Sequence, residues 1–412
     1  MNIHISKLLF ENKIYLILFQ LCVIANAVFG EDKEAFFVSK VFMLLFFVGI
    51  TFKLLASGTR IVLGKSVILP FIFVFYEIVS CAWAFNQEVA ISQLITQLQL
   101  FVLFFFSYIY IKRVGRLEDY YNAIYLSGIG LIFYSLYVYG GLSGFLAIMS
   151  TGHRMGDLIG NENTYGLVFA NAALVALYYL FFNNEKRHVL LAGLLIFFGF
   201  SSGSKKVAFL LLIGLLFLIL SKYGIRKLFK VLLYSFTSLL VGWMFIHLPI
   251  FSTILKRLES YLSVSSNSSD NLRAELIRYG LELFAENPLL GYGLNNYQLF
   301  HWSGLYSHNN YIEVLVSLGI IGFVIYYLIF IKSTVVLFRK RKYLKPIHFL
   351  LTFSILSSFV FGYGMVEFYD KSIWILMGVM LAEVDNIAIA SNINKGLCRR
   401  KEHQNELLFK NN

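Results

Sequence analysis

Charged residues are scarce in this sequence. They make up 14% of its 412 residues, against roughly 25% in a typical soluble domain. The chain is instead 58% hydrophobic and 17% aromatic, and its mean hydropathy is +0.71. A soluble protein of this length has no interior large enough to bury so much apolar surface. The composition therefore excludes a soluble fold and predicts an all-α, polytopic membrane protein.

Cysteine is also rare. The three cysteines, Cys22, Cys81 and Cys398, lie far apart, and the first two fall in apolar runs. Their spacing matches neither a disulfide framework nor a metal-binding motif.

Acidic residues are outnumbered by basic ones, which leaves a net charge of +12. In a soluble chain this excess would suggest a nucleic-acid partner. In a membrane protein it is expected, because cytoplasmic loops are rich in Lys and Arg, so we expect no nucleic acid. Lys7 and Lys13 precede an apolar run as in a signal peptide, but no small-residue cleavage site follows, which favours an uncleaved first helix.

Apolar runs of about 20 residues can cross the ~30 Å hydrocarbon core of a bilayer. The sequence contains neither an internal repeat nor a separate soluble domain, so we expect a single integral membrane domain over residues 1–412. Twelve spans are predicted, at residues 14–29, 36–56, 66–84, 91–111, 120–142, 160–182, 188–202, 206–221, 228–248, 307–331, 347–366 and 369–386.

The basic residues give an orientation for these spans. With the N-terminus in the cytoplasm, the cytoplasmic segments hold 25 of the 35 Lys and Arg residues and the opposite segments hold ten. This bias agrees with the positive-inside rule. It predicts that both termini are cytoplasmic and that Lys205 and Lys206 lie on the outer face.

One predicted outer loop, residues 249–306, is much longer than the other connections. Its second half reads as an amphipathic helix that ends at Asn287-Pro288. Long loops with structure of their own are usually functional. The apolar stripe of this helix comprises Leu272, Leu276, Tyr279 and Leu283.

Three polar stretches on the predicted outer face combine cations, hydroxyls and amides near helix starts. They are STGHRMGDLIGNENTYG (150–166), SSGSKK (201–206), and the loop helix with Arg273 and Arg278 followed by SHNNYIEVLVSLGIIG (307–322). A helix N-terminus offers N–H groups and partial positive charge, and Lys or Arg adds full charge, which together suit a phosphate or pyrophosphate.

Each feature also has a purely structural interpretation. Arg278 can be an interfacial anchor, Asn161 and Asn163 can cap a helix, and the two lysines can mark a helix end. His308 can be an ordinary helix-start residue. At a first helical turn, however, the helix dipole disfavours imidazolium, and a neutral histidine can act as a general base.

Together these motifs resemble those of the O-antigen polymerase and O-antigen ligase superfamily. GNENTYG is similar to the Gly-Asn-Pro-Asn motif of that superfamily, with Glu162 in place of proline. SSGSKK is similar to its Ser-x-Ser-Arg segment, with lysine in place of arginine. NLRAELIRYG with NPLLGYGLNNY resembles its long-loop pattern, and SHNNYIEVLVSLGIIGF its His-Asn and Gly-(Ile/Leu)-(Ile/Leu)-Gly signature. The resemblance covers most of residues 150–330, and the departures at Glu162 and Lys205 leave the roles of those positions open.

The resemblance implies a GT-C-like fold of about twelve spans with one large extracytoplasmic loop. It also implies a membrane glycosyltransferase, free of metal and cofactor, at the outer face of the bacterial inner membrane. Its substrates would be undecaprenyl-diphosphate-linked oligosaccharides, and a chain-length regulator protein is a further expected partner.

For individual residues, the resemblance implies that Lys205 and Arg273 stabilise the leaving pyrophosphate. His308 would deprotonate the acceptor hydroxyl, and the anomeric centre would invert. Whether Lys205 or Lys206 contacts phosphate is open, with Lys205 preferred. The expected substrate-binding residues are Arg154, Asn163, Lys206, Arg278 and Asn309.

The leading hypothesis is a repeat-unit polymerase for O-antigen or capsule. An O-antigen ligase would use the same donor with a lipid A-core acceptor. A transporter or flippase also fits twelve spans, but it predicts repeat symmetry and polar residues at mid-membrane. A structural scaffold would leave the 249–306 loop unexplained.

Overall fold

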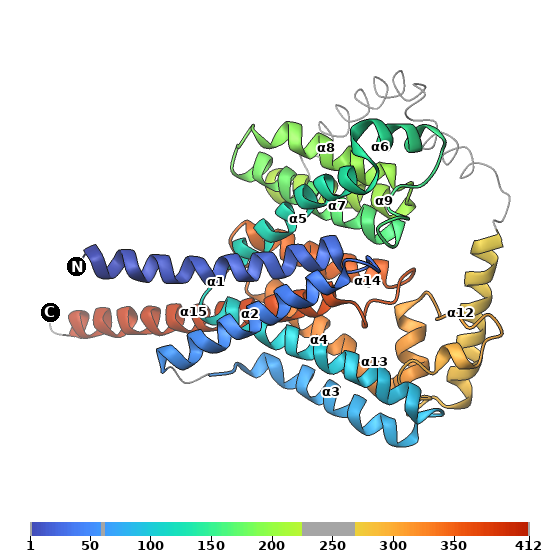
Figure 1. The fold of residues 1–412 in the computed structure, drawn as a ribbon. Helices are drawn as coiled ribbons and strands as arrows, with labels where there is room; N and C mark the ends of the chain where they lie inside the picture. Colours follow the sequence, from blue (N-terminus) through green and yellow to red (C-terminus); the bar gives the residue numbers. More distant parts are fainter. Residues whose placement is uncertain (1, 59–61, 225–267, 411–412) are drawn as a thin grey trace. The chain divides into compact units, whose positions relative to one another are not determined.

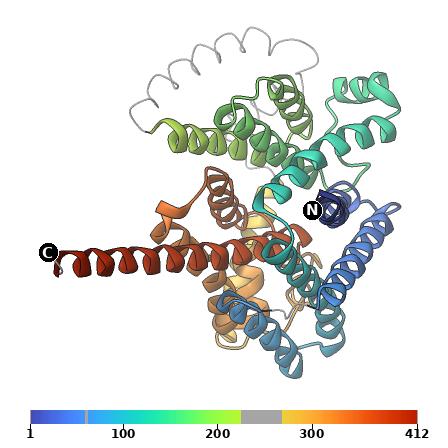
Figure 2. The ribbon, with the colours of Figure 1, turned by 90° about the vertical axis from the view of Figure 1, so that its left-hand side faces the viewer.

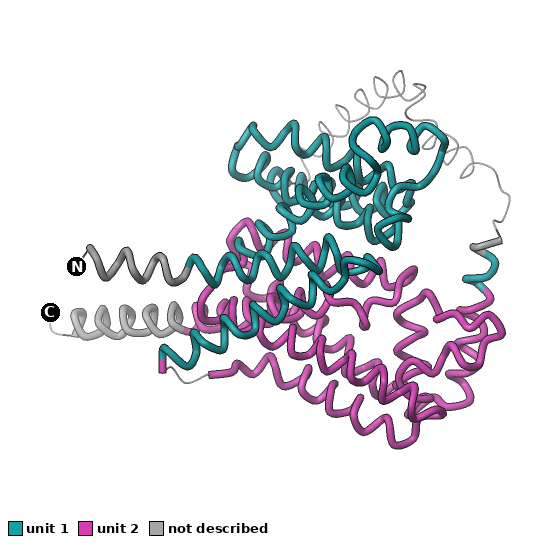
Figure 3. The backbone as a smooth tube through the Cα atoms, viewed as in Figure 1, with its two compact units in different colours: residues 1–57, 118–274 teal, residues 58–117, 275–412 magenta. Residues whose placement is uncertain are grey.

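The computed structural model describes residues 2–58, 62–224 and 268–410. Within these ranges the chain forms helices and turns without a β-strand (Figure 1). Among the described residues, eight helices are long and apolar enough to cross a membrane. The protein is thus an all-helical, polytopic membrane protein, as predicted. Its contacts group into two compact units, residues 1–57 with 118–274 and residues 58–117 with 275–412 (Figure 3).

The first unit is built from two sets of helices. The α1 helix packs along α2, and α7 packs against both α8 and α9 (Figures 1 and 2). Gly166 on α7 permits a close approach to the turn after α8, because a Cβ there would lie 2.3 Å from Ser202 Oγ. The helices of this unit are α1 (Asn2–Phe29), α2 (Phe36–Ser57), α5 (Leu117–Val138), α6 (Gly141–Ser150), α7 (Glu162–Phe182), α8 (His188–Ser201) and α9 (Lys205–Tyr223).

The second unit packs α4 along α15 and α3 along α13. Trp374 is fully buried, with its ring 6.4 Å from that of Phe73 and 6.3 Å from that of Phe104. Gly378 lets α15 approach α4 closely, since a Cβ there would lie 2.5 Å from the Phe104 carbonyl oxygen. Small residues serve this purpose in membrane helices generally. The elements are η1 (Lys65–Val67), α3 (Ile68–Ser80), η2 (Cys81–Trp83), α4 (Gln87–Arg113), α12 (Ser268–Glu286, whose first turns fall in the first unit), η4 (Tyr297–Leu299), α13 (Asn310–Arg339), η5 (Arg341–Tyr343), α14 (Ile347–Phe361) and α15 (Lys371–Lys410).

Eleven of the twelve predicted spans coincide with helices of these units. The remaining span, 228–248, and the first part of the 249–306 loop fall outside the described residues, so the count of twelve stays a prediction. The predicted 120–142 span is longer than the helix, because α5 ends at Val138, before Gly140 and Gly141 with φ of +74° and +85°. A short helix that the sequence did not indicate, α6, follows at once.

The predicted loop helix corresponds to α12. Leu276 and Leu283 are buried, and the helix ends at Glu286, just before Asn287-Pro288. It packs on the start of α13 through Gly280, where a Cβ would lie 2.2 Å from Ile312 Cγ2.

The α13 helix is interrupted at Gly319, which has φ +64° and ψ −171°. The segment after α12 runs along this break and replaces the lost helical hydrogen bonds. Tyr292 N donates to Val316 O at 2.8 Å, and Gly293 N donates to Ser317 O at 2.9 Å. Irregular backbone at membrane depth is tolerated where protein groups satisfy it in this way.

Candidate functional site

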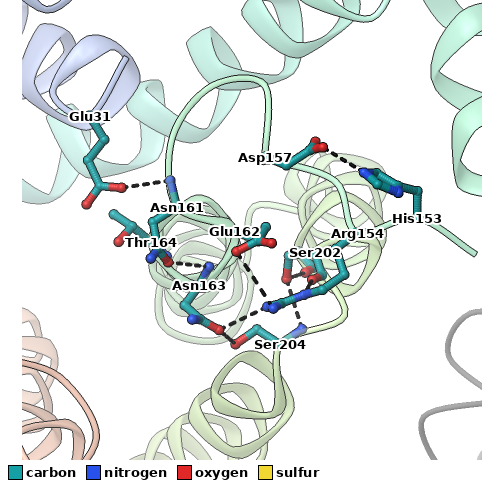
Figure 4. Close-up of polar contacts among 12 residues, drawn as sticks. Glu31, His153, Arg154, Asp157, Asn161, Glu162, Asn163, Thr164, Ser202 and Ser204 are labelled. Carbon is teal, nitrogen blue, oxygen red and sulfur yellow. Dashed lines mark hydrogen bonds and ion pairs between the residues drawn. The ribbon is translucent and has the colours of Figure 1, made fainter. Parts of the chain in front are cut away.

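Arg154 is the centre of a polar cluster in the first unit (Figure 4). Its Nε donates to the Ser202 carbonyl at 3.0 Å, and its Nη2 donates to Asn163 Oδ1 at 3.1 Å. Nη1 lies 3.7 Å from Glu162 Oε2. The guanidinium therefore joins the start of α7 to the turn between α8 and α9.

The two asparagines of the α7 entry have different tasks. Asn161 is the cap, because its Oδ1 accepts from the N–H groups of Asn163 at 2.8 Å and Thr164 at 3.3 Å. The Asn161 N–H itself donates to Glu31 Oε2 at 3.0 Å. The capping interpretation is thus right for Asn161, whereas the Asn163 side chain serves the Arg154 cluster.

Ser204 precedes α9 but does not cap it with its side chain. Its hydroxyl instead donates to Asn163 Oδ1 at 2.9 Å, the same oxygen that accepts from Arg154 (Figure 4). Gly203, with φ +58°, makes the tight turn that brings Ser204 back to α7. The N-terminus of α9 is therefore oriented beside Arg154 without a hydroxyl cap from Ser204.

Lys205 and Lys206 are the first two residues of α9. Lys205 is exposed and Lys206 is half-buried. A cation at a helix N-terminus opposes the dipole, so the position carries no gain for the helix itself. Arg154 and the two lysines thus lie on neighbouring segments of the first unit, with Glu162 Oε2 3.7 Å from the Arg154 guanidinium.

A second polar cluster precedes α13 in the other unit. Asn309 caps α13, because its Oδ1 accepts from the N–H groups of Tyr311 at 2.9 Å and Ile312 at 3.1 Å. Its Nδ2 donates to the Tyr363 carbonyl at 3.1 Å. This expected substrate-binding residue thus has a structural role in holding the helix entry.

Asn310 joins the start of α13 to the segment after α14 by hydrogen bonds. Its backbone N–H donates to Gly362 O at 2.6 Å. Its Oδ1 accepts from the N–H groups of Glu367 and Phe368, and its Nδ2 donates to Tyr327 at 2.8 Å. The start of α13 is therefore fixed on several sides.

His308 lies before this cap and not in the first helical turn, which corrects the position expected from the sequence. The helix dipole falls off within its first turn, so its effect on the imidazole is weaker than that expectation assumed. The backbone of His308 is left-handed, with φ +53°, and its half-buried ring lies 4.1 Å from the Tyr306 ring.

Arg273 and Arg278 are both exposed on α12. Five residues of an α-helix turn through about 500°, so the two side chains project roughly 140° apart. Arg278 lies 3.9 Å from Glu282, and its side chain is 75% exposed. This weak surface pair favours the structural interpretation of Arg278.

The expected site residues thus fall into groups. The structure brings Arg154 and Asn163 into direct contact beside the α9 entry with Lys205 and Lys206, and His308 and Asn309 share the turn before α13. Ser202 and Ser204 complete the first cluster but were not among the expected residues. Their signal was the Ser-Ser-Gly-Ser turn directly before two lysines.

A family model described as O-antigen ligase matches residues 189–327. The match runs from α8 to the second half of α13 and includes both lysines, α12 and the turn with His308. No curated protein matches the chain.

Proposed function

We propose that this membrane protein is a repeat-unit polymerase for a bacterial surface polysaccharide, on the basis of the match between residues 189–327 and a family model described as O-antigen ligase. It transfers a growing glycan from a lipid-linked donor to a lipid-linked acceptor repeat at the outer face of the inner membrane. The family match is the observation that carries the proposal. The roles proposed for individual residues follow from the sequence motifs that resemble those of the O-antigen polymerase and O-antigen ligase superfamily.

The donor is an oligosaccharide on undecaprenyl diphosphate, and breaking its glycosidic bond leaves a negatively charged lipid pyrophosphate. Preorganised cations stabilise such a leaving group in the transition state. Lys205 and Arg273 serve this purpose, with Lys206 and Arg154 beside Lys205 on the first unit. The contacts of Arg154 to Asn163 and Ser202 support this role, because they fix its guanidinium in one place.

The acceptor is a sugar hydroxyl that must lose its proton as it attacks the anomeric carbon. His308 takes this proton as general base, and attack opposite the pyrophosphate inverts the anomeric centre. The half-buried ring and the fixed backbone on both sides of His308 support this role.

Alanine substitution of His308, Arg273 and Lys205 tests these assignments. Purified variants in lipid are given an undecaprenyl-diphosphate-linked repeat unit, and glycan length is followed by electrophoresis. We expect each substitution to reduce elongation at least 100-fold, in line with the loss of a general base or a charge-stabilising group. Normal elongation by H308A and R273A would refute the site.

Arg187→Ala is the matched control for the loss of a cation. Arg187 lies in the turn before α8, its side chain is 79% exposed, and it pairs with the nearby Glu185. Exposed pairs of this kind contribute little to stability. R187A should therefore elongate glycan at the rate of the unmodified protein.

The second candidate function is O-antigen ligase, which the description of the matching family favours. The two functions differ in acceptor and so in the phenotype of a deletion strain. Loss of a polymerase leaves single-repeat chains on the surface, whereas loss of a ligase leaves none. Lipid A-core glycosylation by the purified protein would favour the ligase.

A further inference from the structure

Glu313 is the most deeply buried charged side chain near His308. It lies on the first turns of α13 and is 0% exposed. Its Oε2 accepts from the Ser307 N–H at 2.9 Å, while Oε1 has no hydrogen-bond partner among the described residues. A carboxylate in a membrane helix is costly and is retained mainly for function.

The group that Glu313 holds is the residue directly before His308. Ser307 is itself 0% exposed, and its hydroxyl donates to Asn309 O at 2.8 Å and accepts from Asn309 N at 3.3 Å. The Glu313 N–H closes the ring by donating to Asn309 O at 2.9 Å. Both neighbours of His308 are thus tied to one another and to Glu313.

This arrangement accounts for the backbone of His308. A non-glycine residue in the left-handed region costs about 1–2 kcal/mol, and such a residue persists only where its surroundings fix it. Here the buried side chains of Ser307, Asn309 and Glu313 fix the turn, and only the imidazole between them is turned toward the surface.

We infer that Glu313 is a positioning residue that holds the Ser307–Asn309 turn so that His308 presents its ring to the acceptor. It acts through the hydrogen bond from Ser307 N and not by contact with substrate. The inference rests on the proposed function, because the ring needs precise placement only if it moves a proton.

Two substitutions separate this role from simple packing. In E313M an unbranched apolar side chain fills the same space but cannot accept a hydrogen bond. Replacing a buried charge by an apolar side chain of similar volume is often neutral or stabilising, so E313M should fold. In E313Q the amide oxygen still accepts from Ser307 N.

Kinetics on the purified protein in lipid, with the undecaprenyl-diphosphate-linked repeat as substrate, gives the first test. Misplacement of a catalytic group typically costs about 100-fold. We expect kcat of E313M to fall about 10–100-fold with KM within about twofold, and kcat of E313Q to stay within about threefold of the unmodified protein. The double variant H308A/E313M should be no slower than H308A, because residues that act through one another are not additive.

Hydrogen–deuterium exchange gives a second test that needs no activity. The Ser307 amide should be protected in the unmodified protein and in E313Q, and should exchange faster in E313M. Equal protection in all three would overturn the inference, as would independent effects of H308A and E313M on kcat. If E313M does not fold, E313Q alone decides the test. A 100-fold loss of kcat in E313Q would overturn the inference. Near-normal kcat in E313Q together with a protected Ser307 amide would support the inference.

The outcomes also separate this inference from the proposed function. If H308A elongates glycan normally, the proposed function is wrong. If H308A is inactive while E313M matches the unmodified protein, only the role of Glu313 is wrong.

Discussion

At the residue scale, two asparagines at the start of α7 have different roles in the structure. Asn161 and Asn163 are two positions apart at the α7 entry, yet one caps the helix and the other accepts from Arg154 and Ser204. Composition and local pattern do not distinguish them, because both are good capping residues. The distinction comes from the partners that the α8–α9 turn brings to Asn163.

This distinction predicts opposite phenotypes for two alanine variants. N161A removes the cap and should destabilise the protein by about 1 kcal/mol, with glycan elongation retained. N163A removes the acceptor shared by Arg154 and Ser204 and should reduce elongation at least tenfold with a smaller change in melting temperature. Thermal unfolding in detergent measures the loss of stability, and the elongation assay measures the loss of activity. Identical phenotypes of N161A and N163A would contradict the assignment.

Asp32, in the turn between α1 and α2, provides a pH-dependent contact. Burial raises the pKa of this carboxyl, but hydrogen bonds from the Tyr134 hydroxyl and from the N–H groups of Ala35 and Glu34 outweigh it, and the net pKa lies below the ordinary 3.8. A lowered pKa means that the charged form is stabilising. This stabilisation is present above pH 3.8 and is lost as the pH falls through the lower folded-state pKa.

D32N should therefore melt at a lower temperature than the unmodified protein at pH 7. The difference should shrink as the pH falls below about 4, where the native carboxyl also becomes protonated. Melting curves in detergent at pH 7 and pH 3 provide the measurement. A difference that grows on acidification would show that the sign is wrong.

At the element scale, the break in α13 joins two motifs that are separate in the sequence. Pro288 O accepts from Ile320 N at 2.8 Å, and Tyr292 and Gly293 donate to the carbonyls before the break. The NPLLGYG and SLGIIG segments thus form one structural unit through main-chain hydrogen bonds. The glycine pattern of the second motif is explained by this contact and does not require a substrate.

We accordingly expect G319A to disrupt the second unit. A Cβ at this residue would lie 2.2 Å from the Leu289 carbonyl oxygen, and φ is +64°. Left-handed backbone and overpacking together cost about 2–5 kcal/mol. Yield of monodisperse protein and melting temperature in detergent should both fall.

Gly193 on α8 is the matched control, because a Cβ there meets nothing within 4 Å. G193A should leave yield and melting temperature unchanged. A G319A variant as stable as G193A would contradict the packing of the α13 break.

At the scale of the whole molecule, the orientation in the membrane rests on the distribution of basic residues. It predicts that Lys186 faces the cytoplasm and Gly304 the outside, and both are exposed. In a background without the native cysteines, G304C should react with a membrane-impermeant maleimide on intact cells. K186C should react only after the membrane is opened, and the reverse pattern would invert the predicted topology.

The sequence by itself determined the membrane class, eleven helices and the amphipathic helix before Asn287-Pro288, because long apolar runs and 3.6-residue periodicity are local signals. It also located the polar helix entries, of which those before α9 and α13 lie within the residues 189–327 that match the family model. Tertiary structure alone decided that Ser204 and Arg154 share Asn163, that His308 precedes the α13 cap, and that Glu313 holds its turn. These contacts join residues on different helices or reverse the chain at positive φ, and such pairings are set by packing and not by local preference.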